Sequence, residues 1–500
     1  MANRRPGGGS ADASMGIEGL DDILMGGLER DRVYLLEGSP GTGKTTAAIS
    51  FLRAGAELGE SCLYITLSET ESELRATAES HGWALDGVEV FELVPPESLL
   101  DEQQQQSLLY SSDLELGETT RMIFEAVERV KPRRVVIDSL SEIRLLAQSS
   151  LRYRRQVLAL KHYFARHGAT VLLLDDLTTD SLDKTVHSVA HGVIRVEELS
   201  PEYGAERRRV RVIKYRARKF RGGFHDFTIR TGGLEVYPRL VSAEHKGAFS
   251  RDRLPSGVEG LDAILGGGVE RGSSCLILGP AGTGKSLMAI YFIVSAIQRG
   301  EKAAFFVFDE EIGLLFDRVE GIGIDLRALV DKGDLVIQQV DAAELSPGEF
   351  TALVRDCVDA KNIKTVAIDS LNGYQAAMPE EGFLLLHIHE LLQYLNRQGA
   401  TTFLTVAQHG LVGDMKAPVD VTYLADTVIL LRYFEALGEV RRAVSVIKKR
   451  AGPHEKTIRE FDIGDKGLVV GPPLQGFQGV LRGVPNFVGK GSGLMGDASA

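Results

Sequence analysis

The chain contains few of the residues that mark secreted or metal-binding proteins. It has three cysteines and one tryptophan in 500 residues. Cys62, Cys275 and Cys357 lie far apart and show neither a metal-binding nor a redox spacing. We therefore expect buried, reduced thiols in a cytoplasmic protein.

Long apolar runs and an excess of positive charge are also missing. No apolar run approaches the roughly 20 residues that a membrane-spanning helix needs. The glycine- and serine-rich start of the chain lacks the apolar core of a signal peptide. The formal net charge is −12, which argues against non-specific binding of nucleic acid. We expect neither a membrane nor nucleic acid as a partner.

The chain does contain two glycine-rich loops of the form G-x-x-x-x-G-K-[S/T]. Each loop follows a short apolar run and precedes a helix-compatible segment, which is the context of a phosphate-binding loop. The glycines let backbone N–H groups surround the phosphates, and the helix N-terminus favours their negative charge. The predicted nucleotide-binding residues of the first loop are Gly38, Ser39, Pro40, Gly41, Thr42, Gly43, Lys44, Thr45 and Thr46. Those of the second loop are Gly279, Gly282, Thr283, Gly284, Lys285, Ser286 and Leu287.

The two loops belong to an internal duplication. The segment G-I-E-G-L-D that begins at Gly16 returns as G-V-E-G-L-D at Gly257, and the same offset of 241 residues separates Lys44 from Lys285. Such an unbroken register indicates duplication. Apolar strand patterns alternate with helical patterns in each unit, so we predict two doubly wound α/β domains with mostly parallel sheets. The predicted parts are a disordered head (1–14), a first domain (15–241), a linker (242–252), a second domain (253–470) and a flexible tail (471–500).

Acidic residues follow the predicted strands at matched places in both units. Asp138 and Asp369 end apolar strands downstream of the loops, where a carboxylate can hold Mg²⁺ together with the hydroxyls of Thr45 and Ser286. An aspartate that caps the next helix is the alternative.

A carboxylate that follows the second strand of each unit can act as the catalytic base. Glu69 and Glu310 occupy this place, preceded by Ser68 and Asp309, and we predict Glu69, Glu310 and Asp309 as catalytic residues. The alternative is that these residues are ordinary surface acids.

The last paired feature is basic. Lys214-Tyr215-Arg216 and Lys448-Lys449-Arg450 lie on late strands, and alternation directs the first and third side chains of each triplet to one face. Cations there could reach the γ-phosphate of a neighbouring subunit, which implies a ring. A solvated strand face is the equally weighted alternative on the residues alone.

Together these motifs resemble the KaiC family of two-domain, RecA-like P-loop ATPases. The resemblance covers about Gly16 to Val470 and includes L-A-D-T-V-I-L-L at 424–431 and I-R-E-F-D-I at 458–463. It implies ATP and Mg²⁺ as ligands and a homohexameric double ring with ATP at the subunit interfaces. It also implies slow ATP hydrolysis in the first domain and serine/threonine autophosphorylation in the second. The implied contacts with ATP in a neighbouring subunit are Lys214, Tyr215, Arg216, Arg442, Lys448, Lys449 and Arg450, and Ser80 matches a nucleotide contact of the first domain.

The sequence departs from the family pattern at two places. Thr422-Tyr423 occupies the positions of an adjacent Ser and Thr pair that accepts phosphate, so one aliphatic hydroxyl remains. Ser68 replaces the first residue of a Glu pair, which leaves Glu69 alone. The tail from Gly476 to Pro485 resembles that of homologues outside the cyanobacterial clock, which act in signalling or stress responses. Contact of the tail with a signalling partner is an alternative to an unstructured end.

Two rival functions use the same predicted core. The first is a DNA-dependent ATPase motor of the RecA or helicase type, for which the arginines between Arg207 and Arg221 are a partial argument. The second is a nucleotide-gated scaffold with negligible turnover. ATP hydrolysis that is stimulated by DNA would favour the motor. An ATPase rate that is unchanged in Glu69→Gln would favour the scaffold.

Overall fold

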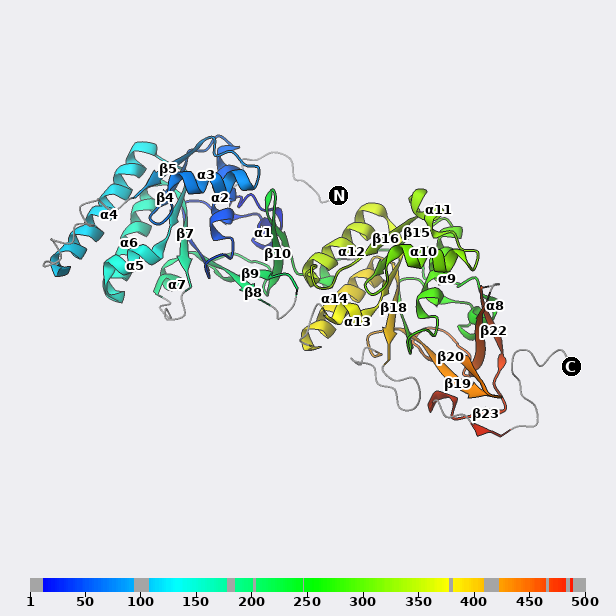
Figure 1. Ribbon diagram of the computed structural model, residues 1–500. Coiled ribbons are helices and arrows are strands. Elements are labelled where there is room, and N and C mark those ends of the chain that lie inside the picture. Colours follow the sequence, from blue (N-terminus) through cyan, green and yellow to red (C-terminus); the bar gives the residue numbers. More distant parts are fainter. Residues whose placement is uncertain are drawn as a thin grey trace. The chain divides into compact units, whose positions relative to one another are not determined.

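The computed structural model divides the chain into two units, Met1–Arg239 and Leu240–Ala500. Figure 1 shows the elements of each unit. The structure describes residues 12–93, 108–177, 185–200, 204–245, 247–376, 381–408, 422–464, 467–482 and 486–488. At 108–115, 185, 376 and 381–384 it describes the backbone only. Each unit is described on its own.

The first unit is built on a nine-stranded sheet in the order β11-β10-β9-β8-β3-β7-β6-β4-β5. The strands are β3 (Val33–Gly38), β4 (Cys62–Thr66), β5 (Val88–Glu92), β6 (Arg134–Asp138), β7 (Thr170–Asp176), β8 (Gly192–Leu199), β9 (Arg207–Tyr215), β10 (His225–Arg230) and β11 (Gly233–Tyr237). The pairs from β8 to β5 are parallel, and those from β8 to β11 are antiparallel. The phosphate loop follows β3, inside the parallel part.

Helices cover both faces of this sheet (Figure 1). They are α1 (Glu18–Ile23), α2 (Lys44–Ala56), α3 (Glu71–Ser80), α4 (Leu108–Val130), α5 (Leu140–Ala147), α6 (Ser150–His167) and α7 (Thr185–Val189). Side chains alternate along the buried strands. Tyr34 and Leu36 therefore pack with α2 and α3, while Val33 and Leu35 pack with α4, α5 and α6.

The second unit repeats this architecture, with the sheet order β16-β15-β17-β18-β14-β19-β20-β21-β22. Its strands are β14 (Ser274–Gly279), β15 (Lys302–Val307), β16 (Leu335–Gln339), β17 (Ile363–Asp369), β18 (Thr401–Ala407), β19 (Thr427–Ala436), β20 (Glu439–Lys449), β21 (Arg459–Gly464) and β22 (Gly467–Pro473). Its helices are α8 (Glu259–Ile264), α9 (Lys285–Gln298), α10 (Ile312–Glu320), α11 (Leu326–Asp331), α12 (Pro347–Lys361), α13 (Leu371–Ala376) and α14 (Glu381–Arg397). The prediction of two doubly wound, RecA-like α/β domains is confirmed.

The structure differs from the predicted boundaries at the start of each unit. Strand β1 (Asp12–Ala13) pairs with β2 (Leu28–Glu29), inside the head that was expected to be disordered up to residue 14. Ala13 is fully buried, which explains the order. The predicted linker contains a short 3₁₀ helix (Ser242–Glu244), and the Ser242 N–H donates to Glu390 at 3.1 Å. The second unit pairs β12 (Arg253–Leu254) with β13 (Val269–Glu270).

The tail also differs from the prediction of flexibility from residue 471. Strand β22 continues to Pro473, and β23 (Phe477–Gln478) pairs with β24 (Asn486–Phe487), with a 3₁₀ helix at Val480–Arg482 between them. Leu474 and Val480 are buried against Phe434 of β19, because burial of apolar side chains outweighs the entropy of a free tail. Residues 489–500 lie outside the described part of the chain.

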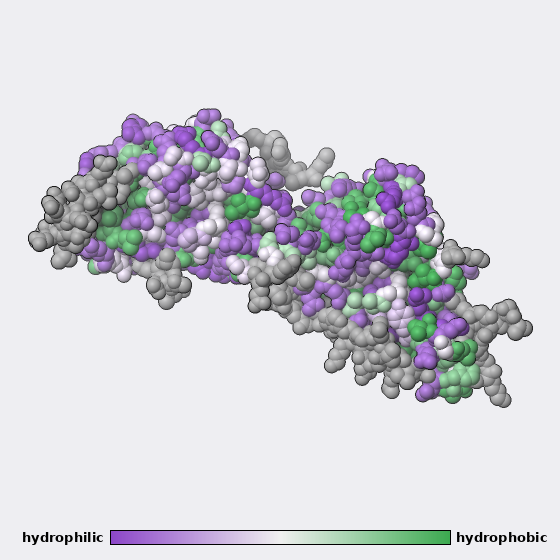
Figure 2. Space-filling model, in the orientation of Figure 1, coloured by the Kyte–Doolittle hydropathy of each residue, from purple (hydrophilic) through white to green (hydrophobic). Residues whose placement is uncertain are grey.

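The visible surface is mainly hydrophilic, with hydrophobic residues gathered near β19 to β23 (Figure 2). The exposed apolar side chains of that region include Leu437, Val440 and Phe487. Within the described residues, no helix is both long and apolar enough to cross a membrane.

Candidate nucleotide-binding sites

Both glycine-rich loops have the conformation of a phosphate cradle. Gly43 ends the first loop at φ 90°, and Gly284 ends the second at φ 97°, in the left-handed region that favours glycine. A Cβ atom on Gly43 would lie 2.7 Å from Ile229 Cδ1, and one on Gly284 would lie 2.5 Å from Ile463 Cδ1. Each loop runs directly into a helix N-terminus, at Lys44 or Lys285. The backbone N–H groups there favour bound phosphate.

The two loop lysines are buried, at 7% exposure for Lys44 and 8% for Lys285. Lys44 Nζ donates to the carbonyl oxygens of Gly38 and Ser39, each at 2.9 Å, and pairs with Asp176 at 2.7 Å. Lys285 Nζ donates to the Pro280 carbonyl at 2.8 Å. Burial lowers the pKa of Lys285, and the charge of Asp369 opposes this.

The two lysines therefore differ in their acidic partner. Asp176 is the last residue of β7 and pairs in register with Gly38. Ala407 takes this position in the second unit, opposite Gly279. The prediction omitted Asp176, although an apolar strand that ends in Asp175-Asp176 is a readable signal for an acid at the site.

The predicted Mg²⁺ ligands lie beside the cradles. Asp138 is 7% exposed and accepts a hydrogen bond of 2.6 Å from the Tyr64 hydroxyl. Thr45 also bonds to Asp138, and burial raises the pKa of this carboxyl group despite the bond from Tyr64. Asp369 accepts a hydrogen bond from the Thr405 hydroxyl. These hard oxygen groups fit Mg²⁺, which keeps waters and phosphate oxygens as its remaining ligands.

The described part of the chain offers no metal cage made by protein groups alone. The described residues contain no cluster of three or more His, Cys, Asp or Glu that could hold a metal. One carboxylate and one hydroxyl per unit therefore fit an ion that arrives with a nucleotide.

Glu69 has the surroundings of a general base. It follows β4, where the Thr66 hydroxyl bonds to both the N–H and the C=O of Glu69 and sets the turn. One carboxylate oxygen is buried with no hydrogen-bond partner among the described residues. Burial raises the pKa of Glu69, the charge of Asp138 adds to this, and Lys44 opposes it. An unpaired carboxylate near the cradle lysine can accept a proton from water.

The equivalent residues of the second unit are held differently. Arg318 of α10 donates to both carboxylate oxygens of Glu310, at 3.1 and 2.7 Å. Asp309 accepts a hydrogen bond from the Ser370 hydroxyl. The first unit has Thr77 at the position of Arg318. The two predicted bases therefore lie in unlike environments, and Glu310 must leave Arg318 to act on a substrate proton.

Ser80 lies at the exposed end of α3, and its hydroxyl donates to the Thr77 carbonyl at 2.7 Å. The next residue, His81, is closer to the loop helix, because its Nε2 lies 3.4 Å from the Thr46 hydroxyl. Sequence reasoning omitted His81, which has no motif of its own.

The late-strand cations contact the segments that precede β8 and β19. Lys214 Nζ donates to the Ala190 carbonyl at 2.9 Å, and Arg216 donates to Ser188 at 2.6 Å. Lys448 Nζ donates to Thr422 and Ala425 at 2.9 and 2.8 Å.

The middle residues of both triplets, which were also predicted to contact a neighbouring ATP, have their side chains buried in their own domain. Tyr215 is buried, and its hydroxyl donates to Gly27. The Lys449 side chain is 0% exposed and pairs with Glu270 at 3.1 Å. Strand alternation directs both into their own domain. Arg442 pairs with Asp462 at 3.2 Å and remains partly exposed.

The predicted phosphoacceptors lie beside positive charge. Thr422 is half-buried, and Tyr423 is 53% exposed. Arg450 donates to the Tyr423 carbonyl at 2.7 Å, close to the bond from Lys448 to the Thr422 carbonyl. Both cations therefore contact the backbone of the turn that carries the two hydroxyls, and positive charge near a phosphorylated residue is stabilising.

The arginines that offered a partial argument for DNA binding are ion-paired within the first unit. Arg208 pairs with Glu198 at 2.8 Å, and Arg209 pairs with Glu197 at 2.8 Å. Arg221 pairs with Asp22 at 3.2 Å. Paired cations offer less charge to a phosphate backbone.

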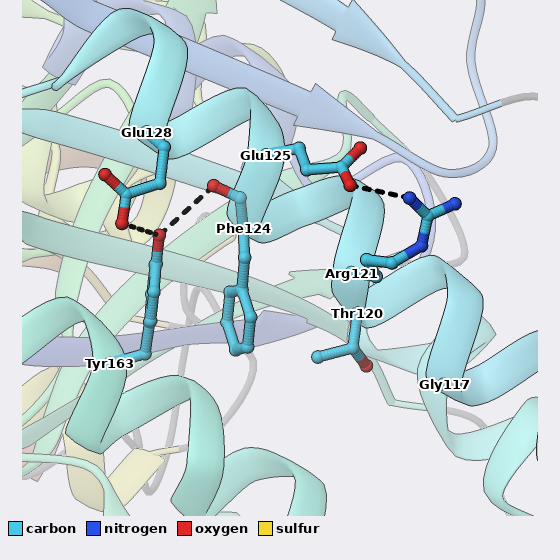
Figure 3. Close-up of a pocket in the computed structure, with 7 residues that line it drawn as sticks. All are labelled: Gly117, Thr120, Arg121, Phe124, Glu125, Glu128 and Tyr163. Atoms are coloured by element: carbon cyan, nitrogen blue, oxygen red, sulfur yellow. Dashed lines mark hydrogen bonds and ion pairs between the residues drawn. The ribbon is translucent and has the colours of Figure 1, made fainter.

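A separate open cavity of about 470 Å³ lies between α4 and α6 (Figure 3). The Tyr163 hydroxyl donates to the Phe124 carbonyl at 3.1 Å and to Glu128 at 3.2 Å. None of the residues that line this cavity belongs to a phosphate loop.

The sheet order, the two cradles and the strand-end carboxylates define a tandem pair of RecA-like P-loop ATPase domains. The family model described as "ATPase: KaiC" matches residues 13–241 and 254–475, so the chain belongs to the KaiC family. The chain is 28% identical over 483 residues to the circadian clock protein KaiC3 of Synechocystis sp., covering 94% of both chains. It is 29% identical over 482 residues to the circadian clock oscillator proteins KaiC of Thermostichus vulcanus and Synechococcus elongatus, covering 94% of this chain and 91% of each of those.

Proposed function

We propose that the chain forms an ATP- and Mg²⁺-binding homohexamer that hydrolyses ATP in its first domain and phosphorylates itself in its second, in cytoplasmic signalling or timing. The observation that carries the hydrolytic part is the unpaired, buried oxygen of Glu69 near Lys44 and Asp138. Family membership supports the use of ATP.

In the first domain the chain's own groups divide the work. The cradle N–H groups and Lys44 bind the phosphates, and Asp138 with Thr45 orients the Mg²⁺ shell. Bound Mg²⁺ would neutralise charge that develops on the transferred phosphate. Glu69 accepts the proton of the attacking water at its free carboxylate oxygen.

In the second domain we propose Thr422 as the phosphoacceptor and Glu310 as its base. Two cations, Lys448 and Arg450, contact the turn that carries Thr422 and support this role. Tyr423 is the second candidate acceptor. We propose that Lys214, Arg216, Arg442, Lys448 and Arg450 of each chain contact the ATP of a neighbouring subunit. A partner that binds the tail would contact residues 489–500, outside the described part of the chain, or the exposed side of β24.

The test is intact-mass spectrometry and phosphate release after incubation with ATP and Mg²⁺. We expect phosphate on Thr422 that is lost in Glu310→Gln and in Thr422→Val but retained in Glu320→Gln, an acidic residue at the end of α10. Undiminished phosphate in Glu310→Gln would contradict the autokinase assignment. DNA-stimulated hydrolysis that falls steeply with salt would favour the motor reading instead.

A further inference from the structure

The two strand-end aspartates receive their hydrogen bond from opposite neighbouring strands. Asp138 ends β6, and its donor Tyr64 is on β4. Asp369 ends β17, and its donor Thr405 is on β18, the equivalent of β7. The same acid is therefore held from one side in the first domain and from the other side in the second.

The register shows that the donors have been exchanged position by position. Tyr64 is opposite Val136, two residues before Asp138, and Phe305 is opposite Ala367, two residues before Asp369. Phe305 thus takes the place of Tyr64 without its hydroxyl. Thr405 lies one residue beyond Leu404, which pairs with Ile368.

The register of β7 with β6 shows which residue of the first domain takes the place of Thr405. Leu173 pairs with Ile137, so Leu174 takes the place of Thr405 without a hydroxyl. The first domain has the hydroxyl donor Tyr64 on one neighbouring strand and the apolar Leu174 on the other. The second domain has the apolar Phe305 and the hydroxyl donor Thr405 at the equivalent positions.

We propose that Tyr64 and Thr405 are positioning residues for the Mg²⁺-binding aspartates, and that each domain needs one such hydroxyl from either neighbouring strand. The inference rests on the proposed Mg²⁺–ATP sites. A bond to one carboxylate oxygen fixes the plane of the carboxylate and directs the other oxygen to the ion's water shell. Partners of this kind typically contribute about tenfold to a hundredfold to metal affinity or activity.

Burial makes the bond to Asp138 specific. Tyr64 is 2% exposed, and its hydroxyl donates to Asp138 at 2.6 Å. Thr405 is fully buried as well. Without the hydroxyl from the neighbouring strand, Asp138 would keep only its bond to Thr45, which is itself a predicted ligand of the ion, and its carboxylate would be less firmly oriented.

The backbone carbonyls of Asp138 and Asp369 are held alike, by the N–H groups of Leu67 and Phe308 at 2.7 Å, so the choice of strand affects only what each side-chain carboxylate is tied to. β4 continues into the turn that carries Glu69, so Tyr64 couples the metal ligand of the first domain to the proposed base. β18 does not lead to Glu310, so Thr405 makes no such link. The donor exchange therefore distinguishes the hydrolytic site from the proposed autokinase site.

The experiment measures the Mg²⁺ requirement of nucleotide binding, in the full chain carrying Lys285→Ala so that the first domain is read. A fluorescent, non-hydrolysable ATP analogue is titrated with Mg²⁺ and, separately, in EDTA. For Tyr64→Phe we expect the half-saturating Mg²⁺ concentration to rise about tenfold, with unchanged affinity in EDTA. For Tyr64→Phe with Leu174→Thr we expect a return to within about threefold of the parent.

Tyr34→Phe is the matched control, because it removes another buried phenol of the first domain, one that donates to the Glu29 carbonyl. Its Mg²⁺ requirement should equal the parent's. An unchanged requirement in Tyr64→Phe, or no recovery with Leu174→Thr in a folded protein, would overturn the inference while leaving the proposed function intact. If the parent protein binds the analogue equally well with and without Mg²⁺, both this inference and the proposed Mg²⁺–ATP sites are contradicted.

The second domain gives the reciprocal test, which also decides the case if Leu174→Thr prevents folding. In the otherwise unchanged chain, Thr405→Val should raise the Mg²⁺ requirement of the second domain's sites, and Phe305→Tyr should restore it. Thr402→Val, three residues earlier on β18, is the control. Equal curves for Thr405→Val and Thr402→Val would overturn the inference.

Discussion

Glu69 is the proposed general base of the first domain. We expect Glu69→Gln to lower ATP hydrolysis about a hundredfold, because an amide cannot accept the proton of the attacking water. The measurement is phosphate release in the Lys285→Ala chain. Glu79→Gln, which changes an exposed acid one residue before the end of α3, is the control. Equal rates for Glu69→Gln and the parent would support the scaffold reading.

The environment of Glu69 predicts a pH dependence. Burial raises its pKa, and the charges of Asp138 and Asp176 raise it further. A base acts only when deprotonated, so the rate should fall on acidification at a pH above the ordinary range of a glutamate. Asp176→Asn removes one of the repelling charges and should move this fall to lower pH. A pH–rate profile that is the same in both proteins would contradict the assignment.

We also expect Asp176 to compete with nucleotide for Lys44. Its carboxylate lies 2.7 Å from Lys44 Nζ, the group proposed to bind phosphate. Asp176→Asn should therefore tighten nucleotide binding by the first domain about tenfold, a change of about 1.4 kcal/mol. The reciprocal Ala407→Asp should weaken binding by the second domain. Calorimetric titration with ADP measures both, and a weaker first site in Asp176→Asn would contradict this role.

At the level of elements, β6 is anchored to the rest of the first domain by Arg134. The side chain is 0% exposed and donates to Glu60 at 2.6 Å and to the carbonyls of Ser14 and Phe51 at 2.6 and 2.8 Å. Arg134→Met should lower the free energy of unfolding by about 3–5 kcal/mol, because it removes the donor of two buried carbonyls and leaves Glu60 with Arg30 alone. Arg129→Met, whose pair with Glu89 is exposed, should cost under about 1 kcal/mol. Urea unfolding of both variants measures the difference.

The same anchor predicts how acid affects this domain. Burial alone would raise the pKa of Glu60, but hydrogen bonds from Arg30 and Arg134 outweigh it and lower the pKa. A depressed pKa contributes stability above the unfolded-state pKa and loses it as the pH falls through the folded-state value. The difference between Arg134→Met and the parent should therefore shrink in acid, and a constant difference would show that Glu60 is not involved.

For the whole molecule, we expect ATP with Mg²⁺ to drive hexamer assembly. Arg216 and Arg450 are both exposed, which is what a contact with a phosphate in another chain requires. Arg216 bonds to the Ser188 carbonyl, whereas Arg450 bonds to the Tyr423 carbonyl and also pairs with Asp426 at 3.1 Å, so it would have to exchange that carboxylate for phosphate. Lys44→Ala should abolish assembly to a greater extent than Lys285→Ala. Sedimentation velocity of both variants tests this, and a hexamer that forms without nucleotide would contradict it.

The sequence by itself determined the duplication, the two phosphate loops and the α/β class. These follow from local rules: a glycine spacing that only a cradle needs, and apolar runs of strand length between helical patterns. The positions of Asp138 and Asp369 at strand ends could be predicted for the same reason, since each follows an apolar run of strand length.

Only the tertiary structure decided which groups meet across strands. Tyr64 and Thr405 carry no motif, and they reach the aspartates because parallel strands distant in sequence lie side by side in a definite register. The burial of Tyr215 and Lys449 and the pairing of Glu310 with Arg318 likewise depend on neighbours that no spacing along the chain specifies. Register and burial are properties of the packed sheet, and they determine how two duplicated sequences come to hold their strand-end aspartates differently.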